Sequence, residues 1–140
     1  MQALTIKTFV PLTWDRAGIA GSLVCIAHCI ATPFLAAGLP ILAVYEKGTH
    51  IGLTVALMLI GLLAFLPGYR NHNKPYMALV AAIGFAMLVL AVFIPETSAS
   101  EMLETGLTVA GGILLISAHL SNAYFCRHCC VCADRSCNQS

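Results

Sequence analysis

Residues 17–45 read AGIAGSLVCIAHCIATPFLAAGLPILAVY, an apolar run without a single charged side chain. A transmembrane helix needs roughly 20 such residues, whereas the apolar part of a secretory signal peptide has only about 7–15. The run is therefore too long for a signal peptide and long enough to cross a bilayer. Gly38 and Pro40 favour an end to the first membrane span near residue 38, because glycine and proline interrupt helices.

The composition of the whole chain agrees with a membrane protein. Of its 140 residues, 59% are hydrophobic and only 9% are charged, and the mean hydropathy is +0.88. Soluble globular proteins carry about 25% charged and roughly 45–50% apolar residues. A net charge of +1, with no basic patch interleaved with aromatic residues, gives no indication of nucleic-acid binding. We expect an integral membrane protein whose first partner is the lipid bilayer.

Three further apolar segments follow, separated by polar or proline-containing connections. Together with the first run they predict an all-α, integral membrane four-helix bundle. A water-soluble bundle would need a charged face on each helix, and these segments have none. We divide the chain into a four-span membrane domain, residues 1–125, and a cysteine-rich tail, residues 126–140. The predicted spans are residues 17 to about 38, 50–67, 76–94 and 101 to about 125.

Basic residues indicate the orientation. With four spans, both termini and the middle loop lie on one side of the membrane. That side holds six of the seven lysines and arginines, and only Lys47 lies on the other. Loops rich in lysine and arginine face the cytoplasm. Both termini are therefore predicted to be cytoplasmic, and the tail cysteines to be thiols or metal thiolates rather than disulfides.

Cys25, His28 and Cys29 form the most informative motif. Residues three and four apart share one face of a helix, so these three side chains project together. Thiolate and imidazole select soft or borderline metal ions, and polar groups inside a membrane are functional candidates by default. The alternative interpretation is that the cysteines act as small hydrophobic residues and His28 bonds to a neighbouring helix.

A second polar seam runs along the fourth span, with His119 and Asn122 as its principal side chains. Counted along the helices from Arg16 and from Arg127, Cys25 and His119 both lie roughly 12–14 Å from the cytoplasmic face. We therefore predict that His119 joins Cys25, His28 and Cys29 in one metal site. Asn122 and Ser22 are expected to support the ligands through hydrogen bonds. Glu104, near the start of the span, is interpreted as favoured by the helix dipole.

The tail carries a dense thiol and imidazole cluster. Its C-x-x-C pair with further cysteines nearby is typical of metal binding. It lacks the second, distant C-x-x-C of a zinc ribbon, so capture or hand-off of a soft cation is favoured over a folded zinc module. A palmitoylated or merely reactive tail is the alternative. The expected tail ligands are Cys126, Cys129, Cys130 and Cys132.

At this level of detail the sequence resembles the MerC-type mercury-resistance membrane proteins. The resemblance implies a multi-pass protein of the inner (plasma) membrane that moves mercuric ion into the cytoplasm. It implies one cysteine pair in the first span, here Cys25 and Cys29, and a second in the C-terminal region. Cys126 and Cys129 match that second pair best, but five tail cysteines leave it open. The resemblance is carried by Asp15, Arg16, Gly18, Gly21, Ser22, Cys25, His28, Cys29, Pro33, Gly68, Tyr69, Arg70, His72, His119, Leu120, Asn122 and the terminal cysteines.

The predicted function is a membrane carrier for a soft metal ion. Mercuric ion is the expected cargo, with Zn²⁺ and Cu⁺ as alternatives, and no permanent cofactor is expected. A cytoplasmic thiol acceptor such as a mercuric reductase is the expected partner. The competing hypotheses are a membrane thiol oxidoreductase and a metal sensor or store. Cys25 and Cys29 are spaced C-x-x-x-C, unlike thioredoxin-type redox sites. No catalytic triad or phosphate-binding loop is visible, so an enzyme is not expected.

Overall fold

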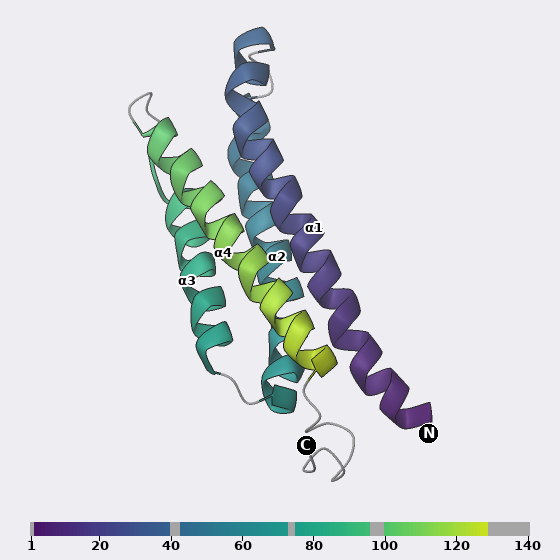
Figure 1. Cartoon of the computed structure of the whole chain (residues 1–140). Coiled ribbons are helices and arrows are strands. Elements are labelled where there is room, and N and C mark those ends of the chain that lie inside the picture. Colours follow the sequence, from purple (N-terminus) through teal and green to yellow (C-terminus); the bar gives the residue numbers. More distant parts are fainter. Residues whose placement is uncertain (1, 40–42, 73–74, 96–99, 129–140) are drawn as a thin grey trace.

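The computed structural model describes residues 2–39, 43–72, 75–95 and 100–128, and its regular structure consists of four α-helices (Figure 1). The described residues contain no strand, which confirms the predicted all-α class. The helices are α1 (Gln2–Gly38), α2 (Ala43–His72), α3 (Pro75–Val92) and α4 (Glu101–His128).

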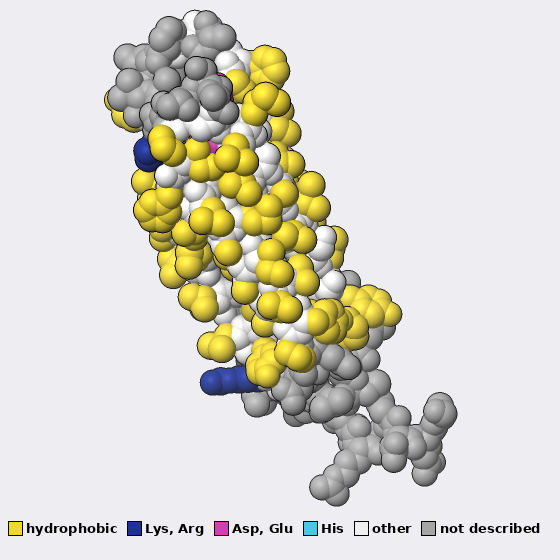
Figure 2. Space-filling view, turned by 90° about the vertical axis from the view of Figure 1, so that its left-hand side faces the viewer, with side chains coloured by type: hydrophobic (Ala, Val, Ile, Leu, Met, Phe, Trp, Pro, Cys, Tyr) yellow, Lys and Arg dark blue, Asp and Glu magenta, His cyan; other side chains and the backbone are white. Residues whose placement is uncertain are grey.

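Each helix is long and apolar enough to cross a membrane. Figure 2 shows hydrophobic side chains along the length of one face of the bundle, with lysine and arginine near its two ends. Large side chains such as Phe34, Phe93 and Met102 are exposed on the outside, where lipid rather than water would cover them. These findings confirm the predicted four-helix membrane bundle. The candidate spans are Thr13–Leu35, Tyr45–Arg70, Pro75–Val92 and Glu101–Cys126.

Helices α1 and α2 extend beyond the spans predicted from hydropathy. Helix α1 already begins at Gln2, well before residue 17, where the first predicted span begins. Helix α2 begins at Ala43 and continues through Pro67 to His72. Hydropathy marks only the part of a helix that suits lipid, and polar residues can continue the same helix outside it. A proline in a membrane helix removes one backbone hydrogen bond and need not end the helix.

The helices form two antiparallel hairpins, α1–α2 and α3–α4, and α4 packs against both α1 and α3 (Figure 1). Small residues bring α3 and α4 close together. A Cβ atom added at Gly84 would lie 3.0 Å from the Gly111 carbonyl oxygen, and one added at Gly111 would lie 2.9 Å from the Gly84 carbonyl oxygen. Such close backbone approach is how membrane helices gain packing contacts without a hydrophobic driving force.

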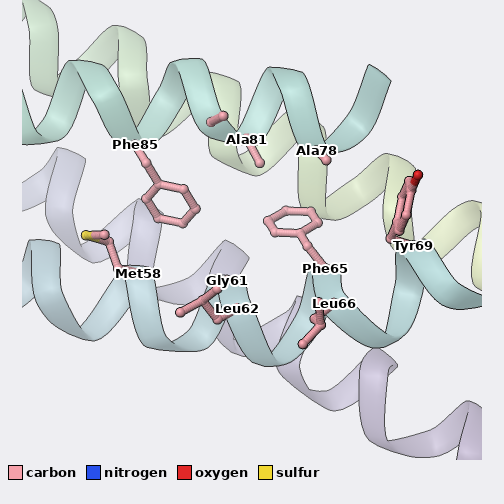
Figure 3. A pocket seen from close by; sticks show the side chains of 10 residues that line it. Met58, Gly61, Leu62, Phe65, Leu66, Tyr69, Ala78, Ala81 and Phe85 are labelled. Atoms are coloured by element: carbon pink, nitrogen blue, oxygen red, sulfur yellow. The ribbon is translucent and has the colours of Figure 1, made fainter. Parts of the chain in front are cut away.

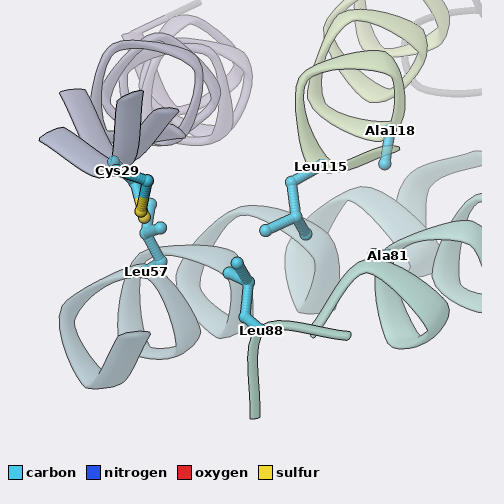
Figure 4. Close-up of a cluster of buried hydrophobic side chains, with 7 residues drawn as sticks. Cys29, Leu57, Ala81, Leu88, Leu115 and Ala118 are labelled. Carbon is cyan, nitrogen blue, oxygen red and sulfur yellow. The ribbon is translucent and has the colours of Figure 1, made fainter. Parts of the chain in front are cut away.

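The two ends of the bundle differ, and we name them by their chain connections. At the loop end, α1 passes to α2 and α3 passes to α4. At the terminal end, α1 begins and α4 finishes (Figure 1). Between the two ends lies an apolar core in which Cys25 and Cys29 pack with leucines and alanines (Figure 4). The other members of this core are Leu57, Ala81, Leu88, Leu115 and Ala118.

An apolar pocket with a volume of about 370 Å³ opens between α2 and α3 (Figure 3). Its wall includes Phe65 and Phe85, and none of its lining residues is a cysteine, histidine or carboxylate. The pocket therefore offers a metal ion no ligand, and the candidate site lies elsewhere.

Candidate metal centre

Cys25 and Cys29 face the interior of the bundle from one side of α1. They are only 2% and 3% exposed, and both are free thiols. Their i, i+4 spacing places the two thiols on one face of the helix. Figure 4 shows the Cys29 side chain pointing from α1 into the bundle. The sequence prediction that these two cysteines share a buried face is therefore confirmed.

His50 is a polar neighbour of Cys29. Its Nε2 lies 3.5 Å from the Cys29 sulfur, and its Nδ1 lies 2.8 Å from Oε1 of Glu104. One imidazole thus joins α1, α2 and α4. A carboxylate only accepts hydrogen bonds, so Glu104 holds the proton on Nδ1. In the neutral ring, this leaves the Nε2 lone pair facing the thiol. A carboxylate behind a histidine in this way is typical of metal-ligating histidines.

His28 completes the group and is the residue before Cys29 on α1. Its ring packs edge-to-face on His50, with ring centroids 5.2 Å apart. Its Nδ1 lies 3.5 Å from the Thr32 hydroxyl, which donates a hydrogen bond to the His28 carbonyl. Ligand atoms of His28, Cys29 and His50 all lie within 4.8 Å of one another. We call Cys25, His28, Cys29 and His50 the cysteine–histidine site.

The donor atoms of this site fit a soft or borderline cation. In a tetrahedral zinc site, with Zn–N and Zn–S bonds of about 2.0–2.3 Å, sulfur and nitrogen ligands lie roughly 3.5 Å apart. The Cys29–His50 separation of 3.5 Å matches that value. Sulfur and imidazole nitrogen are also the ligand types that soft and borderline metals prefer. Ligand atoms of His28, Cys29 and His50 therefore lie close enough together to bind such an ion.

The cysteine–histidine site lies toward the loop end of the bundle. His50 follows shortly after Tyr45, where the α2 span begins, and Glu104 lies in the first turn of α4. Cys29 comes about two helical turns before Leu35, where the α1 span ends. The site is therefore closer to the loop end than to the terminal end.

His119 and Asn122 lie in a second polar cluster, together with Asp15 of α1. His119 Nδ1 is 2.8 Å from Asp15 Oδ1, and Asn122 Nδ2 donates to Asp15 Oδ2 at 2.8 Å. Phe65 of α2 stacks on the His119 ring, with centroids 4.5 Å apart. Gly18 gives the His119 ring its space, because any side chain there would overlap the ring. We call Asp15, His119 and Asn122 the aspartate–histidine cluster.

The sequence predicts that His119 lies with the cysteines in one site, but the structure places it elsewhere. His119 packs against Gly18, about two helical turns from Cys25. The prediction from sequence assumed that Arg16 and Arg127 lie at the same depth in the membrane. In the structure Asn122 is level with Asp15, and Gly112 packs against Ile26. The buried carboxylate sets this register, because it needs hydrogen-bond donors.

Ser22 lies on α1 between the two clusters. It is fully buried, and its hydroxyl oxygen has no hydrogen-bond partner in the part of the chain that the structure describes. The expected supporting hydrogen bond from the Ser22 hydroxyl to the cysteine ligands is thus absent among the described residues. Asn122 instead serves Asp15, and its side-chain nitrogen also lies 3.5 Å from the Ala64 carbonyl.

A family model for the MerC mercury resistance protein matches residues 15–124. The chain belongs to this family. No curated protein and no solved structure gave a match. Membership in the MerC family confirms the resemblance drawn from the sequence and makes the chain a mercury-related, multi-pass membrane protein. The matched region contains both polar clusters and ends before Cys126.

Sequence reasoning missed His50, Asp15 and the role of Glu104. His50 was treated only as the start of a span, and Glu104 only as a helix-dipole residue. A signal was nevertheless present. Helices α2 and α4 run in the same direction, so their first turns lie at the same end of the bundle. A histidine and a glutamate near those two starts are therefore level and able to pair.

The predicted tail ligands are only partly within the described residues. Cys126 belongs to α4, at the terminal end, and is 5% exposed. Helix α4 continues past Cys126 to His128, so the predicted boundary between the membrane domain and the tail falls inside this helix. Cys129, Cys130 and Cys132 lie outside the described residues, and their metal binding stays a prediction.

Proposed function

We propose that the chain carries mercuric ion across the membrane and holds it at the cysteine–histidine site. Cys25 and Cys29 would be the principal ligands, with His50 and His28 completing the coordination. The observation that supports this most strongly is the Cys29–His50 contact of 3.5 Å, beside a second buried thiol and backed by Glu104. Membership in the MerC family supports mercuric ion as the cargo.

Charge balance supports a thiolate pair as the carrier site. A bare dication in hydrocarbon is strongly disfavoured, as any isolated charge is there. When a mercuric ion replaces the two thiol protons of Cys25 and Cys29, the resulting complex carries no net charge. Thiolate is also the ligand that soft ions prefer over water. The same two side chains can therefore remove both the hydration shell and the charge of the cargo.

The position of the site suggests a direction of movement. The positive-inside prediction places the loop end outside and the terminal end in the cytoplasm. The ion would reach the cysteine–histidine site from outside, then leave toward the tail thiols and a cytoplasmic acceptor such as a mercuric reductase. The protein would thus reside in the inner (plasma) membrane.

We expect a cytoplasmic C-terminus from the distribution of lysine and arginine. Green fluorescent protein, which does not fold to a fluorescent form when exported unfolded through the general secretion pathway, should fluoresce when fused after Ser140. Alkaline phosphatase, which needs an oxidising compartment for its disulfides, should be inactive at the same position. The reverse pair of results would invert the proposed direction.

Flux through reconstituted vesicles tests the carrier function itself. Purified protein in sealed vesicles should take up mercuric ion faster than protein-free vesicles do, with a glutathione-like thiol trapped inside as acceptor. Tight binding without faster uptake would make the chain a sensor or store. Uptake of radiolabelled ion, corrected for ion bound at the outer surface, separates the two.

A further inference from the structure

The aspartate–histidine cluster has no part in the proposed cation site, yet it contains the most deeply buried ionisable pair described. The side chains of Asp15 and His119 are each 1% exposed. Both carboxylate oxygens are engaged, one by the imidazole and one by the Asn122 amide. Ionisable groups within membrane spans are rare and commonly serve as proton relays.

We propose that Asp15 and His119 form a proton-binding site at the terminal end, linked to cation occupancy of the cysteine–histidine site. His119 donates Nδ1–H to Asp15, and Nε2 is the atom that gains the proton. With a neutral imidazole the pair carries one negative charge. With an imidazolium it carries none. The proton is exchanged with water, and only an N–H bond is formed or broken.

Among the side chains that the structure describes, His119 is the basic group in contact with Asp15. From α2 the cluster receives the Phe65 ring and the Ala64 carbonyl, neither of which titrates. From α4 it receives the uncharged Asn122 amide. The nearest basic residues along α1 and α2, Arg16 and Arg70, are both exposed. Helix α3 contributes no charged residue, since its only titratable side chain is the exposed Tyr76.

A purely structural role accounts poorly for these residue types. The cluster does tie α1 to α4 and, through Ala64, to α2. A pair of neutral amides could make the same hydrogen bonds without burying a charge, and buried ion pairs are often replaceable without loss of stability. An acid beside a base instead provides a pair that can gain or lose one proton.

The same two helices connect this proton site to the cation site. Helix α1 carries Asp15 and both cysteines, and α4 carries His119 and Glu104. Any shift of α1 against α4 therefore changes both clusters. Linkage is reciprocal, so cation binding must alter proton binding if protonation alters cation binding. This linkage rests on the proposed function, whereas the proton site itself does not.

Histidine NMR tests the proton site directly. Full-length protein with ¹⁵N-labelled histidine, in lipid nanodiscs, is titrated between about pH 5 and pH 8. His119→Gln identifies the relevant signal. We expect the His119 signal to report the gain of a proton as the pH falls, with a midpoint that shifts in Asp15→Asn. Arg16→Gln, which removes an exposed charge at the neighbouring position, should leave the midpoint unchanged. A His119 signal that keeps one protonation state throughout would overturn the proposal.

Uptake as a function of pH tests the linkage. In parent vesicles the initial rate should change several-fold across this range, whereas Asp15→Asn and His119→Gln should each give a flatter profile. Both variants should still bind one mercuric ion per cysteine pair. If both lose thermal stability but keep the profile of the parent, the cluster is only a structural clamp and the proposal fails. Loss of function in Cys25→Ser has no bearing on the NMR titration, so the two proposals fail separately.

Discussion

Cys29→Ser is expected to reduce the initial rate of mercuric-ion uptake to that of protein-free vesicles, and Cys25→Ser to do the same. A hydroxyl is a poor ligand for a soft ion, and a single remaining thiolate leaves the dication with an uncompensated charge in the membrane. The loss of uptake rate should exceed about 100-fold. A loss of about 100-fold in metal affinity or activity is the upper range for removing a residue that only supports a ligand. The measurement is uptake into sealed vesicles that contain a trapped thiol acceptor.

Ala27→Ser is the matched control for these variants. Ala27 lies on the same turns of α1 but is exposed on the outside of the bundle. It therefore introduces the same hydroxyl without touching the site, and uptake should remain normal. Thermal unfolding in detergent shows whether each variant is folded. Folded serine variants that transport like the parent would mean that Cys25 and Cys29 only fill space in the core.

Replacing Glu104 should weaken cation binding although Glu104 lies behind His50. The Glu104 carboxylate lies 2.8 Å from His50 Nδ1 and fixes the tautomer of the His50 ring. Without it, either ring nitrogen could carry the proton. Loss of such a partner typically lowers metal affinity about 10–100-fold, and we expect this for Glu104→Ala. Glu104→Gln should recover part of the affinity, because its amide oxygen can still accept the Nδ1–H bond. His50→Ala should lower affinity at least as much as Glu104→Ala.

Glu101→Ala is the control that separates the two interpretations of Glu104. Glu101 lies in the same first turn of α4 but is exposed. If both carboxylates serve only the helix dipole, their alanine variants should have equal, small effects on stability and none on cation affinity. Affinity is measured by competition with a thiol chelator. Equal affinities for Glu101→Ala, Glu104→Ala and the parent would show that Glu104 does not support the cation site.

The membrane fold could be predicted from sequence because one local property decides it. Long apolar segments such as residues 76–94 leave lipid as the only suitable surroundings. The shared face of Cys25 and Cys29 is equally local, since helical spacing alone determines it. For these features no knowledge of the neighbouring helices was needed.

The pairing of side chains between helices could not be predicted in the same way. His119 was assigned to the cysteines by counting residues from the membrane face, which ignores how helices slide past one another. The actual register follows from specific partners, chiefly the bonds of Asp15 to His119 and Asn122. His50 and Glu104 are distant in sequence, and their contact depends on the packing of α2 against α4.

The most direct test of the cation site uses a chain whose only thiols are Cys25 and Cys29. A chain that ends after His128 and carries Cys126→Ser meets this condition. X-ray absorption at the mercury edge, recorded on the folded protein in lipid, reports the atoms bound to the ion. The prediction is one mercuric ion per chain with two sulfur neighbours, and loss of this ion when both cysteines are also replaced by serine. Failure of this folded two-thiol chain to bind mercuric ion, or binding without sulfur neighbours, would contradict it.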